Sequence, residues 1–131
     1  MAFNFLIVDD SETVRKVIAK TLHMAGVPIN QLFEAGNGKE ALAVLQGNWV
    51  DLIFTDINMP IMGGIELIEK LCEDGMLKTI PVVIVSTEGS QTRIEQLKAK
   101  GVVAYIRKPF QPELIRKVVD EFLGVNDGNQ A

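Results

Sequence analysis

Polar and charged side chains follow directly on four separate apolar runs of this 131-residue chain. The runs are FLIV at 5–8, LIF at 52–54, VVIV at 82–85 and VVAYI at 102–106. The groups that follow them are Asp9 and Asp10, then Asp56 and Asn58, then Ser86, Thr87 and Glu88, and finally Lys108. Four segments that are far apart in the sequence thus each supply groups that could take part in chemistry.

Three of these groups are aspartate carboxylates, from Asp9, Asp10 and Asp56. Brought together, they would repel one another unless a cation lay among them. Oxygen ligands of this kind favour a hard divalent ion, so we expect Mg²⁺, with Mn²⁺ as an alternative. Lys108 could balance part of the charge or hold an anion. A metal ion, an ammonium and a hydroxyl around one carboxylate suit the handling of a phosphoryl group.

A plainer interpretation is that these acids only cap the helices that follow them, as acids after strands often do. A single strand ending in Asp would favour that interpretation. Here Ser11 and Asn37 can already cap two of the helices, and polar groups recur after four strands. We therefore favour a shared site.

Helical periodicity fills the stretches between the apolar runs, and a weaker run lies at 31–35. The order is therefore strand then helix, five times over. Because the runs are continuously apolar and do not alternate, they predict a parallel sheet that is buried on both faces. Right-handed crossovers place helices on both sides. The carboxyl ends of all strands then open on one edge, where such α/β folds bind ligands.

Two helices show clear apolar faces in the sequence. The first is expected to bury Val14, Val17, Ile18, Thr21, Leu22 and Ala25, and the last, with Pro112 in its first turn, Leu114, Ile115, Val118, Val119, Phe122 and Leu123. Arg15, Lys16 and Lys20 are expected to form a solvated face of the first helix.

The fourth helix, expected at 90–100, offers little apolar surface to a core. Only Ile94, Leu97 and Ala99 could be buried there. Since burial stabilises by ~25 cal/mol per Å², this helix should be weakly held and able to shift at low cost. A short, well-solvated surface helix with no such role is the alternative.

The length and composition suit one compact domain over residues 1–124, followed by a disordered tail at 125–131. The net charge of −4 argues against binding to nucleic acid. No stretch reaches the ~18 apolar residues of a membrane span. The single cysteine, Cys72, is expected in the core. Without an intrachain disulfide or a signal peptide, the chain is expected to be cytoplasmic.

Four segments carry a family resemblance: LIVDDS (6–11), FTDINMPIMGG (54–64), VIVST (83–87) and AYIRKPF (104–110). Each is weak alone, but all four occur together in this order and spacing. Over essentially its whole length the chain resembles the receiver domains of two-component response regulators, most closely the single-domain, CheY-like chemotaxis regulators. The resemblance implies a flavodoxin-like, doubly wound (βα)5 fold with the strand order 2-1-3-4-5.

The resemblance makes Asp56 the expected phosphoacceptor, which would take a phosphoryl group from a phosphohistidine of a kinase. Asp10 and Asp56 would bind Mg²⁺ through their side chains. Asn58 would do so through its main-chain carbonyl, and Asp9 mainly through water. Lys108 would pair with Asp56 at rest and with the phosphoryl group afterwards.

The resemblance also implies a conformational switch. Ser86 would hydrogen-bond the new phosphoryl oxygens and pull its loop inward, and Tyr105 would turn from an exposed to a buried rotamer. Thr87 could compete with Ser86, and Tyr105 could be only an aromatic residue at a strand end. Asn58 and Glu88 would tune how fast the phosphoryl group is lost.

Three further residues are expected to shape the loops. Pro60 and Gly64 would set the turn after Asp56, and a cis peptide bond before Pro109 would aim the preceding lysine inward. Gly63 departs from the family, which usually has Asp or Asn there, so a looser turn is expected after Pro60.

These roles predict a phosphorylatable signalling switch that is not a turnover enzyme. Its partners would be a CheA-like sensor histidine kinase and a downstream protein such as a flagellar switch component or a phosphatase, and the chain itself would be a monomer. One alternative is a relay intermediate that passes the phosphoryl group to a histidine phosphotransfer protein. Another is a haloacid dehalogenase-type phosphatase, in which a second Asp would stand at Asn58. A phosphorylation-independent adaptor is disfavoured by the intact site.

Overall fold

The computed structural model describes residues 2–87 and 90–123, and they form five strands and five α-helices. The strands are β1 (Phe3–Val8), β2 (Ile29–Ala35), β3 (Leu52–Thr55), β4 (Val82–Ser86) and β5 (Val102–Arg107). The helices are α1 (Glu12–Met24), α2 (Gly38–Gly47), α3 (Gly64–Cys72), α4 (Gln91–Ala99) and α5 (Pro112–Leu123), with a 3-10 turn, η1 (Leu77–Thr79). All strand pairs are parallel and the order is β2-β1-β3-β4-β5, which confirms the predicted fold.

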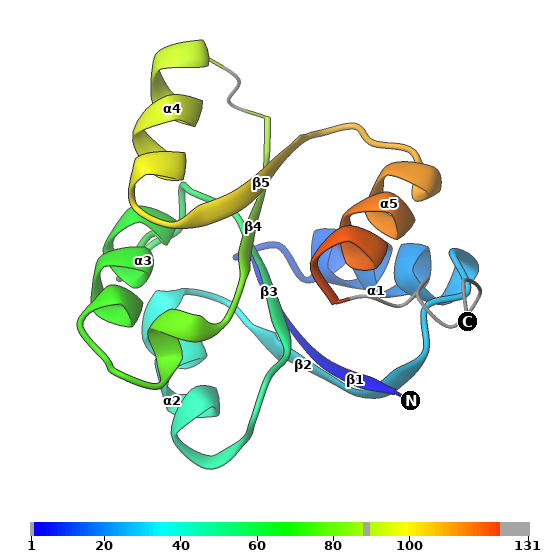
Figure 1. The fold of residues 1–131 in the computed structure, drawn as a ribbon, viewed down its shortest axis with the longest axis horizontal. Coiled ribbons are helices and arrows are strands. Elements are labelled where there is room, and N and C mark those ends of the chain that lie inside the picture. Colours follow the sequence, from blue (N-terminus) through cyan, green and yellow to red (C-terminus); the bar gives the residue numbers. More distant parts are fainter. Residues whose placement is uncertain (1, 88–89, 124–131) are drawn as a thin grey trace.

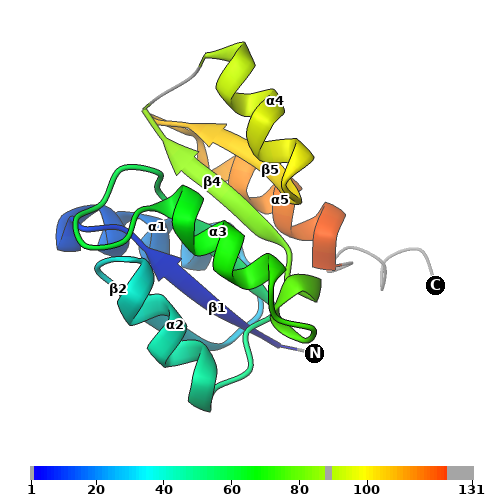
Figure 2. The ribbon, with the colours of Figure 1, turned by 90° about the vertical axis from the view of Figure 1, so that its left-hand side faces the viewer.

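The sheet is the middle of three layers. Helices α1 and α5 cover one face, and α2, α3 and α4 cover the other (Figures 1 and 2). Two clusters of buried apolar side chains fill the two interfaces. Every residue of β3 and β4, and Phe5–Val8 of β1, is buried. These strands are sandwiched between helices, which explains why their sequences read as continuous apolar runs.

Both predicted helix caps are confirmed. The Ser11 hydroxyl accepts a hydrogen bond from the Val14 amide at the start of α1. The Asn37 side chain accepts one from the Glu40 amide at the start of α2. These polar residues therefore satisfy the helix ends, and the acids that follow β1 and β3 are left for other partners.

The predicted apolar faces of α1 and α5 were too wide. Val17 is 51% exposed and Leu114 is 39% exposed, whereas Ile18 and Ile115 beside them are buried. A helix that packs on one face of a sheet buries a stripe of its surface, and residues at the margin of that stripe stay in solvent. Helix α4 fits its prediction, because Leu97 is its only fully buried residue. Among the described residues, no helix has the length and apolarity needed to cross a membrane.

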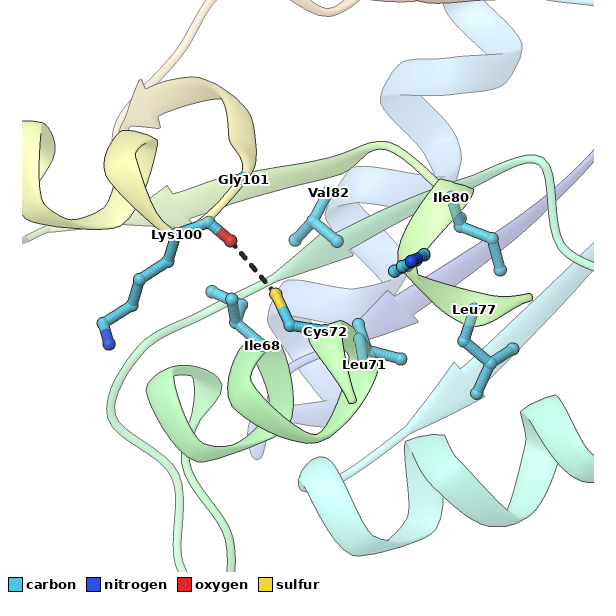
Figure 3. Close-up of a pocket in the computed structure, with 9 residues that line it drawn as sticks. Ile68, Leu71, Cys72, Leu77, Ile80, Val82, Lys100 and Gly101 are labelled. Carbon is cyan, nitrogen blue, oxygen red and sulfur yellow. Dashed lines mark hydrogen bonds between the residues drawn. The ribbon is translucent and has the colours of Figure 1, made fainter. Parts of the chain in front are cut away.

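Cys72 is exposed, so its predicted place in the core is wrong. It is the last residue of α3, where its thiol donates a hydrogen bond of 3.2 Å to the Lys100 carbonyl just after α4 (Figure 3). The core-facing positions of α3 are taken by Leu67, Ile68 and Leu71. Cys72 comes one residue after Leu71, and its side chain lines a small pocket beside η1.

Candidate functional site

The polar residues that follow the strands are held in place by the sheet's own hydrogen bonds. The Asp9 amide donates to the Ala35 carbonyl of β2, and the Asp56 amide donates to the Val8 carbonyl of β1. On the other side, the Lys108 amide donates to the Ser86 carbonyl of β4. Each bond continues the parallel ladder past the end of a strand. The backbone thus brings Asp9, Asp56 and Lys108 to one edge of the sheet, as the sequence predicted.

The ammonium group of Lys108 lies between two carboxylates. Its Nζ is 2.9 Å from Oδ2 of Asp9 and 3.2 Å from Oδ2 of Asp56. The exposed fraction of the side chain is 16% for Lys108, 3% for Asp9 and 15% for Asp56. Three charged groups this far from solvent are tolerable only because they pair with one another.

Two opposing effects set the protonation of Lys108. Burial is the largest single influence and lowers its pKa. The hydrogen bonds and negative charges of Asp9 and Asp56 together outweigh burial, so the pKa of Lys108 is raised above its ordinary value. At neutral pH this lysine is therefore a fixed positive charge at the edge of the sheet.

Asp9 is the most buried acid of the site, since only 2% of the whole residue is exposed. Its Oδ1 accepts a hydrogen bond of 2.9 Å from the Ser11 amide, and its Oδ2 faces Lys108. Both carboxylate oxygens are thus bonded directly to protein groups. Asp10 lies next to it and is exposed. Within residues 2–87 and 90–123, no three Asp, Glu, His or Cys side chains are already gathered in an arrangement that could hold a metal.

The loop after Asp56 is tightly packed. Oδ1 of Asp56 accepts a hydrogen bond of 2.6 Å from the Ile57 amide, and the Gly64 amide donates to the Ile57 carbonyl at 2.8 Å. A Cβ atom added at Gly63 would lie 2.8 Å from that carbonyl oxygen, and one at Gly64 would lie 3.0 Å from the Ile57 Cα. Both glycines therefore permit a close approach of backbone to backbone, and the expectation of a turn looser than that of the family stays a prediction.

Within this loop, Ile61 has a φ of 69°, a left-handed conformation that is unusual for a β-branched residue. It is 77% exposed and stands directly after Pro60. Asn58, one of the predicted metal ligands, is exposed in the same loop. The loop thus presents polar and apolar groups to solvent beside Asp56.

The remaining predicted residues lie around the β4 and β5 ends. Ser86 is buried as the last residue of β4, and Thr87 beside it is exposed. Tyr105 is half-buried on β5, where it packs against the apolar cluster on the side of α2, α3 and α4. The peptide bond between Lys108 and Pro109 is cis, as expected. Glu88 and the tail at 125–131 lie outside the described residues.

Arg15 was predicted to be solvated, and the structure corrects this. Its side chain is only 16% exposed. Its Nη1 donates to the Asp9 carbonyl at 2.7 Å, and its Nε donates to Oε1 of Glu34 at 2.9 Å. Glu34 is 19 residues away on β2, so nothing in the local sequence marks this contact. Lys16 and Lys20 are exposed, as expected.

Many known proteins are similar to this chain in sequence and in fold. Residues 5–120 match the response regulator receiver domain. The chain is 37% identical to chemotaxis protein CheY1 of Helicobacter pylori over 123 residues, which cover 93% of this chain and 98% of that protein. The structure of chemotaxis response regulator CheY4 of Vibrio cholerae is similar, with a TM-score of 0.82 and 33% identity over 93% of this chain and 99% of that one.

The fold is also shared with the receiver domain of sensor histidine kinase PA1611 from Pseudomonas aeruginosa, which was solved with a magnesium ion in its active-site cleft. The TM-score is 0.82 at 18% identity, over 95% of this chain and 99% of that one. The fold, the residues at the strand ends and the similarity to known proteins all indicate the same family, and the similarity extends over nearly the whole chain. The chain belongs to the response regulator receiver domain family.

Proposed function

We propose that this receiver domain is a phosphorylatable switch in which Asp56 accepts a phosphoryl group from a phosphohistidine of a sensor histidine kinase. One observation carries the proposal. Asp56 stands at the end of a buried strand, and the ammonium of Lys108 lies 3.2 Å from its Oδ2 and bridges it to Asp9. The carboxylate is the nucleophile that the step needs, and the paired ammonium places a positive charge beside it, where the phosphoryl oxygens would arrive.

In the reaction, an Asp56 carboxylate oxygen attacks the phosphorus, and the bond between phosphorus and the histidine nitrogen breaks. The products are an aspartyl phosphate and a histidine that keeps the electron pair of the broken bond. The two oxygens of Asp56 have different surroundings, since Oδ1 accepts from the Ile57 amide and Oδ2 faces Lys108. Lys108 is close enough to transfer its hydrogen bond to the incoming phosphoryl oxygens, where it would offset developing negative charge.

The donor set fits a hard divalent cation. Every predicted ligand presents oxygen: the carboxylates of Asp9, Asp10 and Asp56 and the main-chain carbonyl of Asn58. With Lys108 included, the three acids leave a net charge of −2, which a divalent ion would neutralise. Mg²⁺, when bound, would offset charge on the transferring phosphoryl oxygens. Asp9 would contribute through water, because its side chain is the most buried of the three, at 3% exposure against 15% for Asp56.

The output of the switch would run through Ser86, Tyr105 and α4. Ser86 ends the strand beside β5, and its carbonyl already bonds to the Lys108 amide. A shift of the Ser86 hydroxyl toward a phosphoryl group would move the start of the segment that leads to α4. With Leu97 as its one buried residue, α4 has little apolar contact to resist that shift. The altered surface would be read by a protein partner, for which a flagellar switch component or a phosphatase is the proposed kind.

The phosphoryl mimic beryllofluoride, added with Mg²⁺, tests this proposal in solution by NMR. We expect the side-chain signals of Tyr105 and the amide signals of α4 to change. An Asp56→Asn variant should show no change under the same conditions. Unaltered Tyr105 signals in the parent protein would contradict the switch.

A further inference from the structure

Arg15 joins three elements of the fold near the proposed metal site. It projects from the first turns of α1, it donates to the backbone carbonyl of Asp9 after β1, and it pairs with Glu34 near the end of β2. Its neighbour Lys16, in contrast, has a side chain that is 69% exposed and lies 3.9 Å from Glu12 on the same helix. Of these two cations on one helix, only Arg15 is held inside the structure.

The carbonyl that Arg15 holds belongs to the peptide group between Asp9 and Asp10. A peptide group is planar and rigid, so fixing its carbonyl also fixes the direction in which the chain continues into Asp10. The other side of Asp9 is fixed as well, because its amide donates to the Ala35 carbonyl at 3.0 Å. The backbone that carries two proposed ligands is thus anchored on both sides.

Glu34 fixes the guanidinium in turn. Its carboxylate lies 2.9 Å from Nε of Arg15, while Nη1 of the same planar group bonds to Asp9. An arginine can donate from two nitrogens in a fixed fork, and a lysine cannot reproduce that geometry. Such contacts beyond the ligands orient the groups that bind a metal.

We propose that Arg15 is a positioning residue that holds the Asp9–Asp10 peptide in the orientation required for a divalent cation, with Glu34 fixing its guanidinium. This inference rests on the proposed function, since it concerns the cation site of that function. The inference predicts the direction in which cation affinity changes when Arg15 is replaced. A positive charge near a cation site should weaken cation binding, so deleting Arg15 would strengthen binding if charge alone mattered. If positioning dominates, the same deletion weakens binding.

The test is calorimetric titration of the full chain with Mg²⁺, alone and without any phosphodonor. Arg15→Met should raise the dissociation constant by about 10-fold, the lower end of what contacts of this kind contribute. Arg15→Lys keeps the charge and should also weaken binding, because one ammonium cannot hold both partners. Glu34→Gln should weaken it by roughly 3-fold, about a third of the lower-end effect expected for removing Arg15 itself. The matched control is Lys16→Met, which removes the adjacent, exposed charge and should leave affinity unchanged.

Thermal unfolding establishes that each variant is folded, and Arg15→Lys, which keeps the charge, decides the question should Arg15→Met fail to fold. Affinity equal to or tighter than that of the parent chain in the folded Arg15 variants would overturn the inference and leave the proposed function intact. Parental affinity in Arg15→Lys with tighter binding in Arg15→Met would assign Arg15 a charge effect only, which also overturns it. A parent chain that does not bind Mg²⁺ would overturn both the inference and the proposed cation site.

Discussion

Lys108 and Asp9 are 99 residues apart in the sequence, yet their side chains form an ion pair of 2.9 Å in which Asp9 is almost fully buried. The pair joins the segment after β5 to the segment after β1, which are separated in the sheet by β3 and β4. Lys108 then reaches Asp56 from the same nitrogen. The ammonium therefore links the proposed phosphoacceptor, which follows β3, to an acid that follows the neighbouring strand β1.

The protonation of Lys108 should depend on Asp9. Because Asp9 contributes both a hydrogen bond and a negative charge that raise the pKa of Lys108, Asp9→Asn should lower that pKa. The Lys108 side-chain signal, followed by NMR through an alkaline titration, measures the change directly. A Lys108 titration that is identical in the parent and in Asp9→Asn would contradict the proposed pairing.

The same pair predicts a dependence of stability on alkaline pH. A lysine whose pKa is raised by folding contributes its full stabilisation below the unfolded value of about 10.4 and loses it as the pH rises through the folded value. The free energy of unfolding should therefore fall between about pH 9 and about pH 11.5 more steeply in the parent than in Lys108→Met. Urea unfolding at the two pH values gives both slopes, and equal slopes would exclude a raised pKa at Lys108.

Gly64 should tolerate no side chain. An alanine Cβ there would lie 3.0 Å from the Ile57 Cα and 3.1 Å from the Asp56 carbonyl carbon. Since backbone atoms cannot move aside cheaply, Gly64→Ala should lower the free energy of unfolding by about 1–3 kcal/mol and displace the loop that carries Asp56. The control is Gly47→Ala, in α2, where an added Cβ meets no atom within 4 Å. Urea unfolding of both variants checks the prediction, and equal stabilities would contradict it.

Helix α4 should open more readily than α5. Leu97 is the one residue of α4 that is buried, whereas α5 buries Ile115, Val118 and Val119. Burial of apolar surface is what holds a surface helix to its sheet, so the α4 amides should exchange with solvent at a lower free energy of opening than the α5 amides. Native-state hydrogen exchange measures both in one sample. Equal protection of the two helices would remove the basis for treating α4 as the mobile output element.

Much of the fold and of the site followed from the sequence because both depend on the strands. Continuous apolar runs identify strands buried on both faces, and the residue that follows each run must emerge at the same edge of a parallel sheet. Asp9, Asp56 and Lys108 could therefore be placed together without knowledge of any side-chain contact. The cis bond before Pro109 and the strand order came from the family resemblance.

The features that could not be predicted depend on contacts between elements. Arg15 looks like one of three exposed cations on α1, and only its approach to Glu34 on β2 distinguishes it. Cys72 and Val17 lie in apolar stretches, but each falls just outside the buried stripe of its helix. The compact turn at Gly63 depends on the backbone path after Asp56, which residue types alone do not specify.

Asp56 is the residue proposed to carry the phosphoryl group. The most direct measurement is to incubate the full chain with acetyl phosphate and Mg²⁺, reduce the aspartyl phosphate with borohydride, and locate the modified residue by peptide mass spectrometry. We expect modification at Asp56 in the parent chain and in the control Asp51→Asn, at the opposite end of the same strand, and none in Asp56→Asn. Uptake of the phosphoryl group by Asp56→Asn at the parental level, or modification at another residue of the parent chain, would contradict it.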